Sequence, residues 1–273
     1  MKFGKKFFSF RETGDSAKPF LDHLEDLRTV LIKCLLTLGG FMVIGFIFRF
    51  QIAKFVQHPL VSAVPEGARN LQSLAVADAI MISFELAFYA GLIMAFPFLL
   101  FFLAEFILPG LTRAEKKAAL PAALVGFALF IAGASFAYFG MLPPLLRWCY
   151  AQTVDMGWAP SWTVRDYYAI ATQTIIGFGL AFELPVVIVL LAHIGLINTP
   201  QLRSFRPYAL VLSFLLAGII IQTTDLLVFV MVAMPIYLLY EISIIAAYFL
   251  IDKKKLKEAK EKALTDSLSE SDK

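Results

Sequence analysis

The chain alternates between long apolar runs and short polar segments. Apolar runs of about twenty residues recur, and most Lys, Arg, Asp and Glu residues lie between them. An α-helix rises about 1.5 Å per residue, so about twenty residues cross the hydrocarbon core of a bilayer. The predicted fold class is therefore all-α, a polytopic membrane protein. We place its six transmembrane helices at about residues 30–50, 79–103, 120–142, 168–193, 208–221 and 226–250.

The overall composition supports membrane insertion and argues against a soluble enzyme. Of the 273 residues, 59% are hydrophobic and only 16% are charged. A water-soluble domain cannot bury that much apolar surface. No segment between two predicted spans is longer than about thirty residues, which leaves no room for a soluble catalytic domain there. We expect a transmembrane domain over residues 1–251 and a charged, flexible tail over residues 252–273.

The basic residues gather on one side of the predicted bundle. The side of the N-terminus contains Lys2, Lys5, Lys6, Arg11, Lys18, Arg28, Arg113, Lys116, Lys117, Arg203, Arg206 and the lysines of the tail. The opposite side contains only Arg49, Lys54, Arg69, Arg147 and Arg165. Basic residues accumulate in cytoplasmic segments, so we expect both termini in the cytoplasm and an even number of spans. The same asymmetry accounts for the net charge of +3 without a nucleic-acid partner.

The last two predicted spans form an unusually short hairpin. The fifth has about fourteen residues, or about 21 Å of helix, against about 30 Å of hydrocarbon. Glu241 follows a mostly apolar stretch in the sixth and is expected at the cytoplasmic boundary. We therefore expect local thinning of the bilayer beside this hairpin. Prolines 97, 185 and 235 lie inside spans, where they bend helices, so we expect a bent, cup-like bundle.

Carboxylates inside spans are the first candidates for function, because burying a charge in a membrane is costly. Glu85, Glu183 and Glu241 qualify, and Glu183 is flanked by apolar residues on both sides. We expect Glu183 to face a partner, a water-filled recess or a thinned region of the bilayer. The three histidines are far apart and no cysteine or carboxylate lies at ligand spacing, so we predict no metal site and no cofactor.

A second group of acidic residues lies in segments that are otherwise basic. Glu25 and Asp26 occur in FLDHLEDLR before the first span, and Glu115 occurs in the short segment LPGLTRAEKK. One interpretation is helix-end electrostatics or local pairing, for example of Glu25 with Arg28. The other is an acidic site for a basic peptide.

These motifs resemble the TatC family, the multispanning receptor subunit of the twin-arginine protein translocase. The similar stretches are FLDHLEDLR, the HPL after the first span, EFILPGLTRAEKK, FAYF, GFGLAFELPVVIVLL, SFRPY and MPIYLLYEI. The resemblance implies six spans with cytoplasmic termini in the bacterial inner membrane. It also implies binding of signal peptides that carry consecutive arginines, and export of folded proteins driven by the proton-motive force. The expected partners are single-span proteins of the TatA and TatB type, lipid and further copies of the chain.

The resemblance also implies roles for single residues. Positions that correspond to the signal-peptide site are Glu25, Asp26, Phe106 and Glu115, and Glu183 corresponds to an intramembrane glutamate. On the outer face, Pro59 and Asp225 correspond to positions that are structural or contact a partner. The sequence departs from the family at Asp26, where glutamate is usual, and at positions 223, 224, 229 and 85.

Two other functions remain as alternatives. A secondary transporter could use Glu183 and Glu85 as a proton relay, although the sequence has no inverted repeat. An intramembrane hydrolase would need a nucleophile and a base at one depth, and the sequence offers no such pair. We therefore expect no enzymatic activity.

Overall fold

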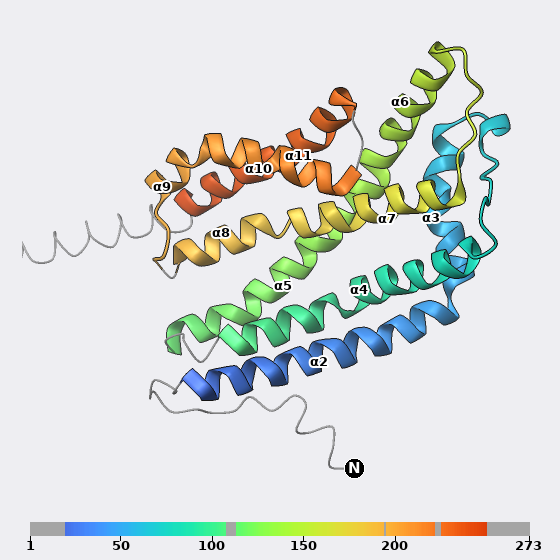
Figure 1. The fold of residues 1–273 in the computed structure, drawn as a ribbon. Helices are drawn as coiled ribbons and strands as arrows, with labels where there is room; N and C mark the ends of the chain where they lie inside the picture. Colours follow the sequence, from blue (N-terminus) through green and yellow to red (C-terminus); the bar gives the residue numbers. More distant parts are fainter. Residues whose placement is uncertain (1–19, 108–112, 194, 222–224, 250–273) are drawn as a thin grey trace, which may run out of the picture. The chain divides into compact units, whose positions relative to one another are not determined.

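The computed structural model describes residues 20–107, 113–193, 195–221 and 225–249. At residues 20–23, 107, 113–120, 122 and 193 it describes the backbone only. The described chain is almost entirely helical, which confirms the predicted fold class (Figure 1). The helices are α2 (Phe20–Ile47), α3 (Arg49–Ala63), α4 (Asp78–Ile107), α5 (Arg113–Ser135), α6 (Leu142–Asp155), α7 (Val164–Ala181), α8 (Leu184–His193), α9 (Thr199–Ser204), α10 (Arg206–Ile221) and α11 (Leu226–Ala247).

Five helical segments of the described chain are long and apolar enough to span a membrane. They are Leu24–Ile47, Asp78–Phe106, Ala123–Asp155, Val164–Ala192 and Leu226–Ala247. The fifth predicted span corresponds to α10, which has 16 residues and is shorter than these. All six predicted spans therefore have a helix, and the short fifth one is confirmed as short. The transmembrane count of six and the orientation of the termini stay predictions, as does the division at residue 251.

The chain divides into two compact units. The first unit contains Met1–Ile52 and Ser83–Phe127, and the second contains Ala53–Ile82 and Ala128–Lys273. In the first unit, α2 and α4 lie side by side and antiparallel (Figure 1). The rings of Phe41 and Phe98 stack with centroids 5.5 Å apart, and those of Phe46 and Phe84 lie 5.0 Å apart.

Close contact between α2 and α4 depends on small residues. A Cβ atom placed on Gly45 would lie 2.8 Å from the carbonyl oxygen of Ala87, and one on Gly91 would lie 2.8 Å from the backbone nitrogen of Met42. Lipid tails are as apolar as leucine, so helices in a membrane associate through such close packing. The two glycines therefore set the distance between these helices.

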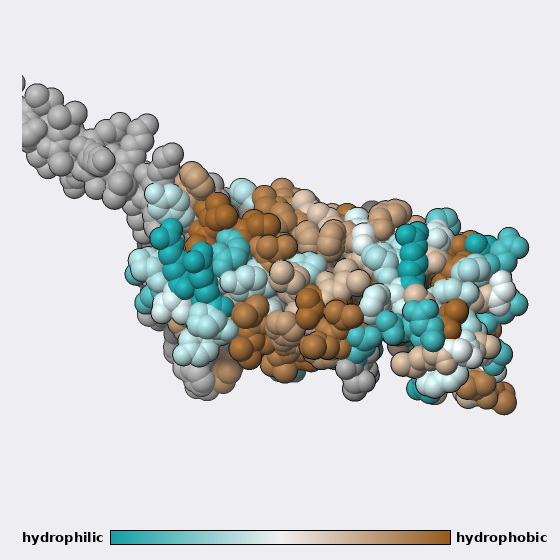
Figure 2. All heavy atoms as spheres, turned by 90° about the horizontal axis from the view of Figure 1, so that it is seen from above, coloured by the Kyte–Doolittle hydropathy of each residue, from teal (hydrophilic) through white to brown (hydrophobic). Residues whose placement is uncertain are grey.

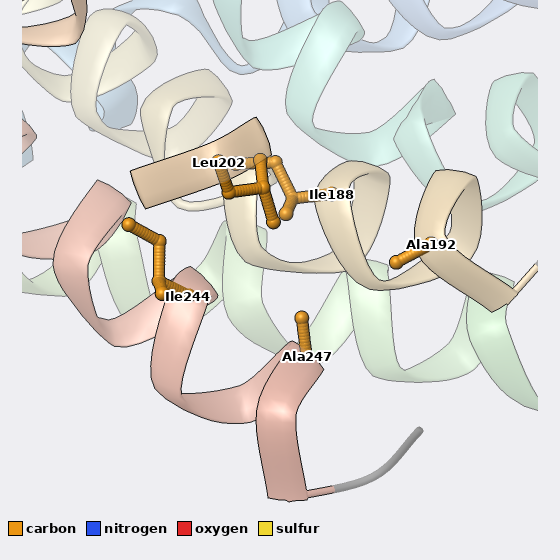
Figure 3. Close-up of a cluster of buried hydrophobic side chains, with 5 residues drawn as sticks. All are labelled: Ile188, Ala192, Leu202, Ile244 and Ala247. Atoms are coloured by element: carbon orange, nitrogen blue, oxygen red, sulfur yellow. The ribbon is translucent and has the colours of Figure 1, made fainter. Parts of the chain in front are cut away.

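In the second unit, α8, α9 and α11 enclose an apolar cluster. Figure 3 shows its five buried side chains, Ile188, Ala192, Leu202, Ile244 and Ala247. The hydroxyl of Tyr240 donates to the carbonyl of Leu202 at 2.6 Å, which attaches α11 to the short helix α9. Figure 2 shows hydrophobic residues gathered over α10 and α11, with hydrophilic residues at the α9 end and the α6 end. This apolar band is the surface expected to face lipid.

An ion pair links the two helices of the α10–α11 hairpin and places Arg206 and Glu241 at the same depth. Nη2 of Arg206, the first residue of α10, lies 2.8 Å from Oε2 of Glu241, and Tyr237 donates to the other carboxylate oxygen at 2.8 Å. From Arg206 to Ile221, and from Leu226 to Glu241, the helices extend about 22 Å. Because the hydrocarbon core is about 30 Å thick, this geometry supports the expected thinning.

Two segments predicted as loops are helical. The third helix does not end at Leu142 but continues through a π-helical segment, Phe136–Met141, into α6. Trp148, which follows the predicted end of the third span, therefore lies on α6. After the first span, one residue separates α2 from α3, a helix that the sequence pattern does not predict. Its mixed composition has no strong apolar period, which is why the pattern does not indicate a helix there.

Candidate functional site

The predicted acidic site lies in the first unit, where α2 begins and α4 ends. Glu25 and Asp26 belong to the first turns of α2, and Phe106 is the penultimate residue of α4. The side chain of Glu25 is exposed, and those of Asp26 and Phe106 are half-buried. Glu115 lies in the first turns of α5, and its side chain is outside the described residues.

An ion pair joins the middle of α2 to the end of α4. Nζ of Lys33 lies 2.8 Å from Oε2 of Glu105, and the lysine also lies 5.6 Å from the centroid of the Phe102 ring. Both charged side chains are largely buried, at 16% and 26% exposed. Removing one partner would leave an uncompensated charge, which destabilises a protein strongly. The sequence-based predictions did not include this pair, although a lysine inside a predicted span was the available signal.

The ion pair changes which carboxylates are available at this end of the first unit. Glu105 is neutralised by Lys33 and cannot serve a basic ligand without breaking that contact. Glu25 lies about two turns before Lys33, or about 12 Å along the helix axis. Because α2 and α4 are antiparallel, the exposed Glu25 lies at the same end of this helix pair as Phe106.

Glu183 lies at a break in the fourth span. Helix α7 ends at Ala181, Glu183 donates its backbone N–H to Leu180 at 3.1 Å, and α8 resumes at Leu184. Pro185 explains the break, because it has no N–H for the carbonyl of Ala181 and its ring clashes with that carbonyl. The helix is therefore interrupted just before Pro185, whereas α4 and α11 continue past Pro97 and Pro235.

The carboxyl group of Glu183 is incompletely hydrogen-bonded. Its Oε1 is buried and has no hydrogen-bond partner among the described residues. The side chain as a whole is half-buried, so part of it still reaches the surface of the second unit. A buried polar atom without a partner is costly, and a donor from outside this chain would remove that cost.

Pro59 is explained by a contact between α3 and the π-helical segment. A proline inside a helix leaves the carbonyl four residues earlier without its usual donor, here the carbonyl of Phe55. The hydroxyl of Tyr138 donates to that oxygen at 2.7 Å, and the Phe55 and Tyr138 rings stack with centroids 4.5 Å apart. Pro59 itself is buried. The tyrosine of the FAYF motif thus compensates for the proline of the HPL motif.

Asp225 begins α11 and also attaches that helix to α6. Its Oδ1 accepts a hydrogen bond from the backbone N–H of Leu227 at 2.8 Å, and its Oδ2 accepts one from Nε1 of Trp148 at 3.1 Å. The bond from Trp148 and the backbone N–H groups lower the pKa of Asp225 below its usual value. The stability this residue contributes is thus present above the pKa of the unfolded chain and is lost as the pH falls through the folded pKa.

Comparison with known proteins identifies the family. The family model described as Sec-independent protein translocase protein (TatC) matches residues 22–235. The chain belongs to the TatC family. A TatC protein of Deinococcus radiodurans is 36% identical over 236 residues, which cover 84% of this chain and 86% of that one. One from Akkermansia muciniphila is 40% identical over 190 residues, which cover 69% of this chain and 55% of the relative.

A solved TatC structure has the same fold. The crystal structure of a twin-arginine translocase receptor, TatC, superposes with a TM-score of 0.75 at 32% identity and covers 83% of this chain and 98% of that chain. The protein is therefore a multi-pass component of the Sec-independent translocase in a bacterial inner membrane. It belongs to a family of protein translocase components.

Two more tyrosines of this TatC chain also donate hydrogen bonds to backbone carbonyls of α3, at positions that Pro59 does not affect. Tyr167 donates to the carbonyl of Val56 at 2.6 Å, and Tyr168 donates to that of Ala53 at 3.1 Å. The sequence did not predict these contacts. The partners are more than 100 residues away in the chain. Every residue has a backbone carbonyl, so the sequence does not indicate which one accepts the bond.

Replacing Tyr138 by phenylalanine is expected to destabilise the second unit by about 1–3 kcal/mol, because the Phe55 carbonyl loses its donor. In a Pro59→Ala background the same change should cost clearly less, since an alanine at that position supplies the missing backbone N–H. Thermal unfolding of the four proteins in detergent measures this coupling. Equal costs in both backgrounds would show that Tyr138 does not compensate for Pro59.

Proposed function

We propose that this chain is the substrate receptor and core scaffold of a twin-arginine translocase. It binds signal peptides with two consecutive arginines and supports the export of folded proteins through single-span partners of the TatA and TatB type. The proton-motive force drives transport, and both termini lie in the cytoplasm. Copies of the chain associate within the complex.

The observation that carries the proposal is the position of the acidic residues in a TatC chain. Glu25 is exposed at the end of the α2–α4 pair that carries Phe106, while Glu105 is neutralised by Lys33. The carboxylates for a basic ligand come from Glu25, Asp26 and Glu115, and Phe106 supplies an apolar contact. A guanidinium group binds a carboxylate through two parallel hydrogen bonds, so a pair of arginines needs two such acceptors.

Glu183 serves a second contact in this proposal. Its Oε1 has no donor among the described residues. A polar group on a partner helix, or on the inserting signal peptide, supplies that donor. Pro59 and Asp225 hold the outer ends of the helices in place through Tyr138 and Trp148.

A photocrosslinker at position 115 in native membranes tests the receptor function. We expect a crosslink to a signal peptide with Arg-Arg and its loss with Lys-Lys, because lysine cannot form the forked pair. The variant Glu115→Ala should still insert and should lose crosslinking from a probe placed at Phe106. Equal crosslinking of both peptides would contradict the proposal.

A further inference from the structure

A cavity of about 380 Å³ lies in the second unit beside α3, the π-helical segment and α6. Its polar lining consists of His58, Ser62 and Arg147, and its apolar lining includes Pro59, Tyr138 and Phe139. None of the described lining residues is acidic. The size is at the lower end for small-molecule sites and fits a headgroup better than a whole lipid.

The basic side chains of the cavity have free hydrogen-bonding capacity. Arg147 donates one long hydrogen bond, 3.4 Å from Nη2 to the carbonyl oxygen of Ser62. Within the described residues, the imidazole ring of His58 makes no hydrogen bond or ion pair. A guanidinium and an imidazole facing one cavity are typical ligands of a phosphate group.

The cavity lies near one end of the third membrane-spanning segment. The sequence predicts that this segment begins at about residue 120, and its helix continues through the π-helical segment and α6 to Asp155. About twenty residues cross the hydrocarbon, which places the opposite boundary near residue 142. Tyr138 and Phe139 therefore lie just inside the hydrocarbon boundary, and Arg147 lies where phospholipid headgroups are found.

Two apolar side chains next to the cavity are exposed. Phe139, in the π-helical segment, is 71% exposed, and Phe55, one turn before Pro59, is 59% exposed. A free phosphate ion gains nothing from such neighbours. A phospholipid gains apolar contacts with them, because its acyl chains continue from the phosphate into the membrane.

We propose that this cavity binds the phosphate of an anionic phospholipid of the phosphatidylglycerol type. Arg147 and His58 hold the phosphate oxygens, Ser62 lies at the edge of the site, and an acyl chain packs on Phe139. The absence of a carboxylate from the described lining favours a headgroup with net negative charge over a zwitterionic one. The site also places a lipid beside the Pro59–Tyr138 contact.

Native mass spectrometry of the delipidated full chain in detergent tests the site. We expect phosphatidylglycerol to bind at least about tenfold more tightly than phosphatidylcholine, and His58→Ala/Arg147→Ala to lose this preference. Arg147→Lys keeps the charge but not the fork and should bind with intermediate affinity. Arg165→Ala removes another cation, one that does not line the cavity, and should bind like the native chain.

Two further outcomes distinguish the ligand. Phe139→Ser should weaken binding of phosphatidylglycerol but not of glycerol phosphate. Equal affinity of the native chain for glycerol phosphate and phosphatidylglycerol would identify a free-anion site and overturn the lipid proposal. So would unchanged lipid preference in the double variant, provided that its thermal unfolding shows it to be folded. A photocrosslinker at position 139 that captures protein and no lipid would also overturn it.

Discussion

Replacing Gly91 by alanine is expected to destabilise the first unit by about 1–3 kcal/mol, the usual cost of overpacking a tight contact. The new Cβ would lie 2.8 Å from the backbone nitrogen and 2.9 Å from the Cα of Met42. Backbone atoms cannot rotate away as a flexible side chain can, so α2 and α4 must separate. Their separation would also lengthen the Lys33–Glu105 ion pair. Thermal or denaturant unfolding of the purified chain measures the effect.

Gly40 provides a matched control on α2. It is exposed, and a Cβ there would meet nothing within 4 Å. Gly40→Ala should leave stability unchanged or raise it, since alanine is up to about 1 kcal/mol better than glycine in a helix. The two substitutions are chemically identical, but only Gly91→Ala should lower the stability. Equal effects would mean that glycine content, and not the α2–α4 contact, sets the stability.

The apolar runs of the sequence were sufficient to predict where the long apolar helices lie. Hydrophobic length decides whether a helix crosses a bilayer, and it can be counted directly in a sequence. The same counting predicted that α10 is short, and the Arg206–Glu241 contact now shows that α10 and α11 are matched in depth. Family motifs then indicated TatC, which the comparison with known proteins confirmed.

Contacts between distant segments could not be predicted in this way. Lys33 and Glu105 are 72 positions apart, and the Tyr138 hydroxyl meets a carbonyl 83 positions away. Nothing in the sequence around Pro59 states which residue replaces its missing donor. Phe229 departs from the family pattern, and its packing is visible only in the structure. Its ring lies against Gly218 of the neighbouring helix.

The exposed end of the acidic site remains a prediction for a physical reason. A receptor site must keep carboxylates accessible until the ligand arrives, so the internal contacts of the chain cannot reveal it. The Lys33–Glu105 ion pair excludes Glu105 from the carboxylates that could bind a basic ligand. It also holds the end of α4 beside α2, which keeps Phe106 and Glu25 at the same end of the helix pair.

Replacing Glu183 by alanine is expected to block export while leaving signal-peptide crosslinking at position 115 intact. The substitution removes the acceptor that we propose for a polar group of a partner helix. Interhelical hydrogen bonds in membranes contribute about 0.6 to 1.7 kcal/mol, so partner association should weaken about three- to twentyfold. Co-purification with a TatA- or TatB-type protein and export of a reporter measure the two effects.

The control for Glu183 is another polar group of the same span. Thr174, on α7, is fully buried, and its Oγ1 also has no hydrogen-bond partner among the described residues. Because its side chain is sealed inside the second unit, Thr174→Val should leave partner association unchanged. Glu183→Gln keeps a hydrogen-bonding group of the same length and should retain most of the association if a hydrogen bond is what the partner supplies. If Glu183→Gln also loses partner association, the contact requires a carboxyl group. If Glu183→Ala assembles and exports normally, Glu183 is only a structural residue at the helix break before Pro185.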